Sequence, residues 1–214
     1  MPLLKLDLHV HTTGSPDAHT KVEDLPSIIK AKGLDGIAIT EHNNFNPPSF
    51  SDVIILPGIE VSSRHGHVLG LGTYEAIPQG LSADETIRRI HDQDGVAIIP
   101  HPHDPVSKCV RIRELKMRPD AVEVLNADAL AFHLSRWLAR RDAHKFKLPE
   151  VAGSDSHIPE TIGDAYTIIQ SPTRHVKDIV EAIRMGAVSP RGHATSLANK
   201  LRKSRYKSNE HLTL

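Results

Sequence analysis

Short apolar runs of strand length alternate with amphipathic helical stretches along most of this 214-residue chain. Eight runs have the pattern of strands, at residues 3–11, 36–42, 53–61, 67–73, 95–101, 121–127, 149–157 and 165–171. Helical periodicity occupies residues 21–33, 82–95, 127–146 and 173–186. Such alternation predicts an α/β fold with parallel strands joined by crossovers. Seven or eight strands in a chain of this length favour a small closed β/α barrel, and an open doubly wound sheet is the alternative.

The composition narrows the class of protein. The chain has 26 Lys and Arg against 26 Asp and Glu, so no overall charge directs it to nucleic acid or membrane. Its single cysteine, Cys109, excludes an internal disulfide framework and is typical of a reducing compartment. No apolar run approaches the roughly 20 residues that cross a bilayer, and the N-terminus has no signal pattern. We therefore predict a cytoplasmic protein without membrane contact.

Residues 1–195 are predicted to form one domain. The segment 196–214 is basic and has little apolar pattern, so we expect it to be a flexible extension. Its cations could contact phosphate or RNA. The sequence does not indicate an oligomeric state.

The chain contains 15 histidines, and many of them fall where predicted strands end. In the first strand, successive side chains point to opposite faces, so Asp7, His9 and His11 share one face. The other strand ends supply further imidazoles and carboxylates: Asp17, His42, Glu60, His67, His101, Asp155 and His157. In a barrel these ends converge, and converging carboxylates and imidazoles require a divalent cation to be stable together. Nitrogen and oxygen donors without thiolate favour Zn, Mn or Fe, and the number of donors favours two or three ions.

Seven segments resemble, in order, the motifs of the PHP (polymerase and histidinol phosphatase) superfamily. They are DLHVHTTGSPD, ITEHN, PGIE, HVLGLG, IIPHPH, EVLNA and GSDSH, and the resemblance runs from about residue 4 to about residue 190. It implies a distorted seven-stranded TIM-like β/α barrel with a trinuclear site at its carboxyl face. Its motif positions imply three ligand sets: His9, His11, Glu60 and Asp155; Glu60, His67 and His101, with Glu60 bridging; and Asp17, His42 and His157. Pro16 stands where the family often has its Asp ligand, and Asp17 lies one residue later.

The resemblance and the donors together lead to the hypothesis of a metal-dependent phosphoesterase that acts through a metal-bound hydroxide. His157 or His103 would give a proton to the leaving oxygen, and Arg64 and Arg191 would grip the phosphate. The substrate would be a phosphomonoester of a small metabolite or nucleotide, or the end of an oligonucleotide. Single-stranded nucleic acid is therefore a candidate partner.

Two other functions fit the same residues. One is a nucleic-acid-associated barrel that acts as a binding subunit, which the basic C-terminal segment favours slightly. The other is a metal-dependent amidohydrolase, a class that typically bridges its metals with a modified lysine on a middle strand. Here the middle-strand residue is Glu60, and no lysine ends a predicted strand.

Three further predictions concern individual side chains. Asp7 should orient the His9 ring through a hydrogen bond. Glu41 should point away from the site, and Trp137 should pack within its helix.

Overall fold

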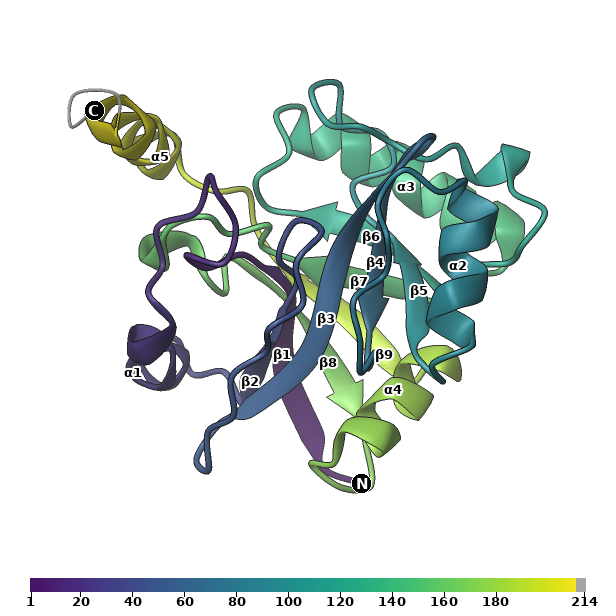
Figure 1. Ribbon diagram of the computed structural model, residues 1–214, viewed down its shortest axis with the longest axis horizontal. Coiled ribbons are helices and arrows are strands. Elements are labelled where there is room, and N and C mark those ends of the chain that lie inside the picture. The colour runs from purple at the N-terminus through teal and green to yellow at the C-terminus, as the bar shows by residue number, and fades with distance from the viewer. Residues whose placement is uncertain (211–214) are drawn as a thin grey trace.

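The computed structural model describes residues 1–210, with side chains described up to residue 206. Its centre is one mixed sheet in the order β7-β6-β5-β4-β3-β2-β1-β8-β9 (Figure 1). The strands are β1 (Leu3–Val10), β2 (Gly36–Ile39), β3 (Ile54–Ser63), β4 (Gly66–Leu71), β5 (Val96–Ile99), β6 (Ala121–Asn126), β7 (Glu150–Gly153), β8 (Ala165–Gln170) and β9 (Val188–Gly192).

Helices cover this sheet and connect several of its strands. They are α1 (Leu25–Ala31), α2 (Ala83–His91), α3 (Phe132–Phe146), α4 (Val176–Arg184) and α5 (Leu197–Glu210). Short 3-10 turns occupy Val22–Asp24, Ile112–Glu114 and Pro159–Thr161. Ser82 begins α2, where its side chain accepts a hydrogen bond from the Glu85 N–H.

The sheet curls until its two edges approach each other. Although β7 and β9 stand at opposite ends of the strand order, β7 contacts β9 and β1, and Val10 forms a bridge with Ser156. The predicted α/β barrel-like fold is therefore confirmed. The carboxyl ends of β1, β2, β3, β5, β6 and β7 lie at one end of this nearly closed barrel, because these strands run in the same direction.

The barrel has nine strands, two more than the resemblance implied, and it is not wholly parallel. β4 runs antiparallel to β3 and β5 because only Arg64 and His65 separate β3 from β4, and so short a connection makes a hairpin. β8 runs antiparallel to β1 and β9. The sequence did not indicate β9, whose central Pro190 is tolerated because β9 is an edge strand.

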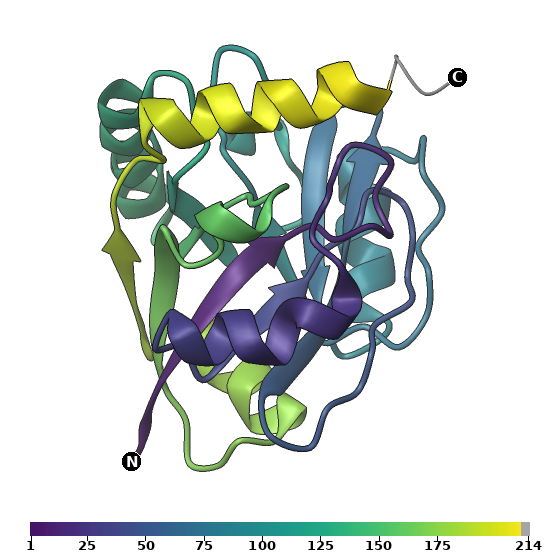
Figure 2. The same cartoon turned by 90° about the vertical axis from the view of Figure 1, so that its left-hand side faces the viewer.

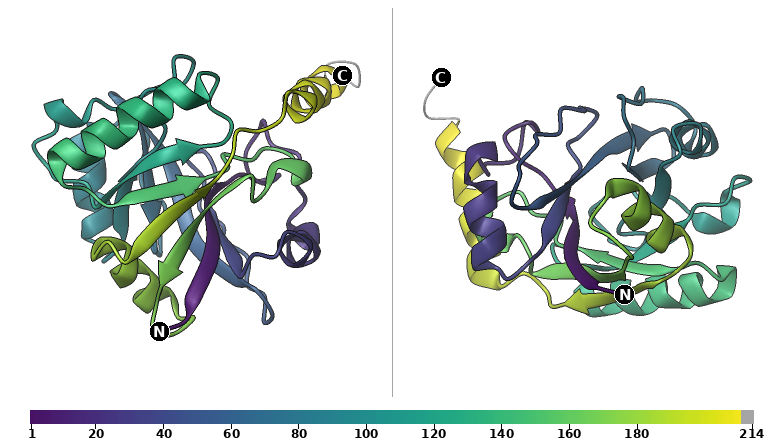
Figure 3. Two further views of the ribbon diagram at one scale, coloured as in Figure 1. Left: turned by 180° about the vertical axis from the view of Figure 1, so that it is seen from behind. Right: turned by 90° about the horizontal axis from the view of Figure 1, so that it is seen from below.

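Apolar packing closes the amino end of the barrel. Ile179, Val180 and Ile183 of α4 pack in one buried cluster with Leu4 and Leu6 of β1. Seen from below, α4 lies across the opening of the barrel (Figure 3, right). The polar face of β1 is also buried, since Asp7 and His9 are fully inaccessible. The interior polar side chains therefore need partners inside the barrel.

The segment after residue 196, where the sequence indicated no regular element, forms α5. This helix runs across one end of the molecule (Figure 2). Lys203 of this helix pairs with Asp128, Arg202 pairs with Glu160, and the Tyr206 ring stacks on His19 with centroids 4.8 Å apart. The part of the predicted extension beyond residue 210 lies outside the described residues. Among the described helices, none has the length and apolar character needed to cross a membrane.

Candidate metal centre

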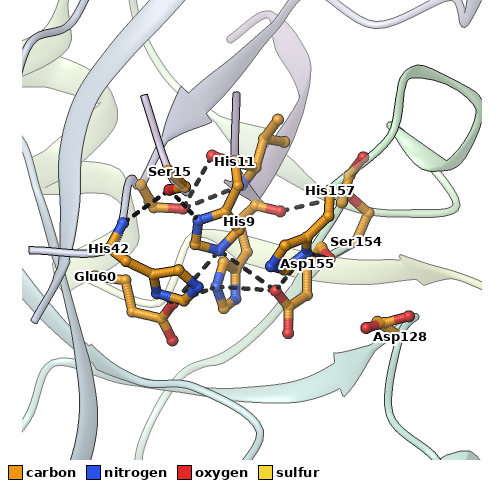
Figure 4. Close-up of polar contacts among 12 residues, drawn as sticks. His9, His11, Ser15, His42, Glu60, Asp128, Ser154, Asp155 and His157 are labelled. Atoms are coloured by element: carbon orange, nitrogen blue, oxygen red, sulfur yellow. Dashed lines mark hydrogen bonds and ion pairs between the residues drawn. The ribbon is translucent and has the colours of Figure 1, made fainter. Parts of the chain in front are cut away.

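The structure brings all nine predicted donors to the carboxyl end of the barrel. Figure 4 shows His9, His11, His42, Glu60, Asp155 and His157 pointing toward one another. His9 and Glu60 lie within β1 and β3, and His67 is the second residue of β4. The remaining donors lie in the loops that follow strands: His11 and Asp17, His42, His101, Asp155 and His157. The period of two in β1 placed His9 and His11 as expected, since their rings are neighbours with centroids 5.2 Å apart.

Glu60 is the centre of this arrangement. Its carboxylate is 1% exposed and faces five imidazoles. Oε1 lies 2.9 Å from His67 Nδ1 and 3.2 Å from His101 Nε2. Oε2 lies 2.9 Å from His42 Nδ1, 3.4 Å from His11 Nε2 and 3.6 Å from His9 Nε2. A carboxylate shared in this way has the geometry of a bridging ligand.

Two aspartates complete the cluster from other sides. Asp155 Oδ1 lies 3.5 Å from His9 Nε2 and 3.4 Å from His11 Nε2. Asp17 lies 3.5 Å from His42 Nε2 and 3.4 Å from His157 Nε2 through its two oxygens. Asp17 is thus close to both partners that the resemblance gave it.

Three groups of donor atoms are each compact enough to surround an ion. His9, His11 and Glu60 form one, and Glu60, His67 and His101 form another; the third consists of His11, His42 and His157. Within each group the donor atoms lie within 4.8 Å of one another. His11 therefore belongs to two groups, as Glu60 does. The clusters are consistent with a polynuclear metal site.

The donor atoms themselves fit a metal. Among the described residues, four buried donor atoms of the cluster have no hydrogen-bond partner: His9 Nε2, His11 Nε2, Glu60 Oε2 and His67 Nδ1. Buried polar atoms without partners are costly, and atoms that converge on one space are best explained by a ligand there. Imidazole nitrogens with carboxylate oxygens are typical ligands of Zn, Mn or Fe.

The pKa shifts of the donors also bear on metal binding. Burial by itself raises the pKa of Glu60, but the charge of His9 and the close imidazoles of His101, His42 and His67 outweigh it and hold that pKa well below its usual range. Burial and the neighbouring His157 lower the pKa of His11 to about 3. Glu60 is therefore ionised and His11 neutral near pH 7, which are the protonation states that bind metal. The charge of Asp155 outweighs burial and raises the pKa of His9, and contacts with Cys109 and Glu60 raise that of His101 to about 10, so a metal would displace protons from these two rings.

Two donors sit on an unusual backbone. His101 and Asp155 have φ angles of 32° and 54°, in the left-handed region that non-glycine residues rarely adopt. His101 lies two residues after the end of β5, and Asp155 lies two residues after the end of β7. Strained residues of this kind cluster at functional sites, where the surrounding structure holds them in place.

Glu123 was missed as a part of the site. Its Oε1 lies 3.1 Å from His9 Nδ1, while its Oε2 accepts hydrogen bonds from the His101 N–H and the Asn126 side chain. The signal was a carboxylate inside the apolar strand AVEVLN, 2% exposed in the structure. Glu123 therefore orients one donor ring and the backbone of another.

The prediction that Asp7 orients His9 is wrong. Asp7 accepts hydrogen bonds from three backbone N–H groups, those of His9, Ser154 and Gly163. Asp7 thus ties β1 to the loops after β7, and the His9 ring turns to Glu123 instead because β6 lies on that side.

The prediction that Glu41 points away from the site is also wrong. Glu41 is 3% exposed and accepts hydrogen bonds from the N–H and hydroxyl of Thr12 and from the hydroxyl of Ser15. Ser15 Oγ in turn lies 3.1 Å from His11 Nδ1 and accepts from the His42 N–H. Glu41 thereby organises the loop that positions two donors.

Three other predicted site residues are not drawn into the cluster. The His103 ring pairs with Asp142 of α3 at 2.9 Å. Arg64 is exposed, and its Nε donates to the Gly80 carbonyl. Arg191 donates to Ser189 Oγ and lines a cavity with Arg136 and Arg140 that includes none of the nine donors.

Comparisons with known proteins agree with the fold and the motifs. The family model described as PHP domain matches residues 7–99, and the one described as PHP-associated matches residues 133–188. An uncharacterized protein of Methanocaldococcus jannaschii is 34% identical over 142 residues, which are 58% of this chain and 82% of the relative.

Several solved structures share the fold at low identity. PsfC from Pseudomonas syringae has a TM-score of 0.72 at 18% identity and covers 98% of this chain and 99% of its own. A two-domain Bacteroides vulgatus protein containing a predicted PHP-like metal-dependent phosphoesterase has a TM-score of 0.67 at 19% identity, over 90% of this chain and 65% of its own. The lesion-specific endonuclease PfuEndoQ from Pyrococcus furiosus has a TM-score of 0.66 at 16% identity, over 88% and 58%. This chain thus spans less than two thirds of the latter two proteins.

The ordered motifs, the barrel with its donors at the carboxyl end and the matched family models lead to one conclusion. The chain belongs to the PHP domain family.

Proposed function

We propose that this protein is a metal-dependent phosphoesterase whose cluster holds two or three divalent ions of Zn, Mn or Fe. The observation that carries the proposal is Glu60, one buried carboxylate within 3.6 Å of five imidazoles. His9, His11 and Asp155 would share one ion with Glu60, and His67 and His101 a second. Asp17, His42 and His157 would hold a third.

Two similar structures support the class of reaction. The Bacteroides vulgatus protein is described as containing a predicted metal-dependent phosphoesterase, and the Pyrococcus furiosus protein as an endonuclease, a class of enzyme that also cleaves phosphate esters. Bound divalent ions would polarise a phosphate and activate a water molecule for attack on phosphorus.

The exposure of the donors indicates how a substrate would enter. The side chains of Asp17 and His42 are 35% and 24% exposed, whereas those of His9, His11 and Glu60 are at most 1% exposed. The His67 side chain is also 17% exposed, so a phosphate ester would approach over the exposed rim that Asp17, His42 and His67 form. Its leaving group could be a small metabolite, a nucleoside or the end of an oligonucleotide.

Among the predicted catalytic residues, His157 is better placed than His103 to serve a leaving oxygen. The His157 Nδ1 shares a hydrogen bond with the Asp155 carbonyl, and its Nε2 lies 3.4 Å from Asp17. In a site with two ions this Nε2 would serve the leaving oxygen, whereas in a site with three ions it would bind the third ion instead. Arg64 follows the last residue of β3, the strand that carries Glu60. Since Gly80 engages its Nε, a phosphate would use the two terminal nitrogens.

The test combines metal content with activity. Purified protein should contain at least two equivalents of Mn, Zn or Fe per chain, and a chelator should abolish hydrolysis of p-nitrophenyl phosphate, bis-p-nitrophenyl phosphate or short single-stranded RNA. Glu60→Ala should lose metal and activity together, while the partly exposed control Glu85→Ala, which is none of the nine donors, should keep both. Hydrolysis at the wild-type rate by Glu60→Ala would contradict the proposal, as would a protein that takes up no metal.

A further inference from the structure

The basic residues of this neutral chain are unevenly distributed. Residues 108–118 and 136–147 together contain ten of its 26 Lys and Arg but only two of its 26 Asp and Glu, namely Glu114 and Asp142. The first segment follows β5, and the second forms most of α3. Such segregation in a chain without net charge marks a surface for a polyanion.

The two segments form one surface, which we call the basic groove. Arg118 joins them, because its guanidinium donates to the carbonyls of Phe146 and Lys147 at the end of α3. Between the segments lies a groove of about 550 Å³. Arg111 and Arg113 line it from one segment, and Arg141 and Lys145 line it from α3.

The positive charge of the basic groove is only partly neutralised by its own acids. Arg111 and Arg113 share the single carboxylate of Glu114, at 3.3 and 3.7 Å. The Asp142 carboxylate lies 3.8 Å from Arg141, and its other oxygen is engaged by His103. Four cations therefore face two carboxylates, and a bound anion would neutralise the remaining positive charge.

An exposed aromatic ring lies next to Arg141, one of the residues that line the groove. Trp137 was expected to pack within its helix, but it is 61% exposed. Trp137, Arg141 and Lys145 are four residues apart in turn, so they form one row along α3. The Arg141 guanidinium lies 5.6 Å from the centre of the Trp137 ring. A flat exposed ring beside a row of cations is the arrangement on which unpaired bases stack.

The basic groove also adjoins the metal centre. Pro102 and His103 line it, and they directly follow the donor His101. Cys109 lines it as well, and its Sγ lies 2.8 Å from the His101 carbonyl oxygen. A strand held in the groove would therefore run toward the cluster.

We propose that the basic groove binds the phosphodiester backbone of a single-stranded nucleic acid, with a base stacked on Trp137. This inference deepens the proposed function, because it names the class of substrate that reaches the metal centre. Binding itself does not require the metals, since the groove residues are none of the nine donors.

Because Trp137 is the only tryptophan of the chain, its fluorescence reports on the groove directly. A 20-nucleotide oligodeoxythymidine, added in the presence of a chelator that prevents turnover, should quench it. Anisotropy of the labelled strand at several salt concentrations should then give the number of phosphate contacts. For single strands the logarithm of the binding constant falls with the logarithm of salt by about 0.7 per contact.

Two variants separate the charge from the ring. Replacing all four groove cations by Gln (Arg111, Arg113, Arg141 and Lys145) should reduce the salt slope by about 3 and weaken binding. Trp137→Ala should weaken binding of the strand about tenfold and leave the slope nearly unchanged. A matched control replaces four exposed cations elsewhere (Lys5, Lys30, Arg174 and Lys177) by Gln and should bind like the wild type.

The outcomes distinguish this inference from the proposed function. Equal losses of strand affinity in the groove variant and in the control would overturn the proposed binding groove. Binding of the matching duplex as tight as that of the single strand would overturn the stacking role of Trp137. If strands fail to bind while chelator-sensitive hydrolysis of p-nitrophenyl phosphate persists, the groove is wrong and the phosphoesterase stands. If strands bind but the protein takes up no metal, the phosphoesterase is wrong and the groove stands.

Discussion

Glu123 contacts the His9 ring on the side away from Glu60 and Asp155, with Glu123 Oε1 3.1 Å from His9 Nδ1. Both side chains are buried, and the opposite nitrogen of His9 points toward Glu60 and Asp155. A carboxylate behind a ligand imidazole selects its tautomer and raises its basicity.

We therefore expect Glu123→Gln to reduce metal affinity about 10- to 100-fold while the protein still folds. The substitution keeps the size of the side chain but removes its charge. Competition with a chromophoric chelator would measure the affinity. The control Glu114→Gln, on an exposed turn, should bind metal like the wild type, and an unchanged affinity in Glu123→Gln would refute a positioning role.

Asp7 should make the stability of the metal-free protein depend on pH. Burial raises the pKa of Asp7 to about 7, from an unfolded value near 3.8. Between these values the folded state binds more protons than the unfolded state, so this group's contribution to the free energy of unfolding decreases as pH rises from about 4 to about 7. The loss is at most about 1.4 kcal/mol per pH unit.

Asp7→Asn removes this titration. Urea unfolding with chelator at pH 5, 6 and 7 should therefore show the stability of the wild type falling relative to that of Asp7→Asn. Asp52→Asn is the control, because Lys30 lowers the pKa of exposed Asp52 and its titration lies below this range. A wild-type-to-Asn difference that stays constant over these pH values would contradict the raised pKa.

Glu41 should stabilise the loop that precedes α1. Its removal leaves the buried N–H and hydroxyl of Thr12 without their acceptor. Glu41→Ala should lower the free energy of unfolding by about 1–3 kcal/mol, measured by urea denaturation of the metal-free protein. Glu23→Ala, at an exposed position nearby, should change it little; equal effects of the two would argue against a specific role of Glu41.

Gly153 should tolerate no side chain, because a Cβ there would lie 2.4 Å from His9 Cβ and 2.6 Å from Glu123 Oε1. Gly153→Ala must displace His9, so we expect lower stability, by about 1–3 kcal/mol, together with weaker metal binding. Gly33→Ala is the comparison, since its Cβ would meet open space but its φ of 65° strains the backbone. That variant should lose stability and keep its metal affinity. Normal metal uptake by Gly153→Ala would contradict the close packing.

Much of the fold was predictable because its signals are local. The alternation of apolar runs predicted eight of the nine strands near their observed positions. β9 was not predicted because it is short, half exposed and contains Pro190, and only its pairing with β8 makes it a strand. α5 was not predicted because its amphipathic pattern is weak, and because its described contacts, with His19, Asp128 and Glu160, are to residues far away in the chain.

The sequence by itself determined which side chains could serve as metal donors, because strand periodicity and the positions of strand ends depend on neighbouring residues alone. Only the tertiary structure decided what stands behind those donors. Glu123 contacts His9 although the two lie 114 positions apart in the chain. Asp7 instead accepts a hydrogen bond from the Ser154 N–H, in the loop after β7. Such contacts follow from how the barrel curls, and no local pattern carries that information.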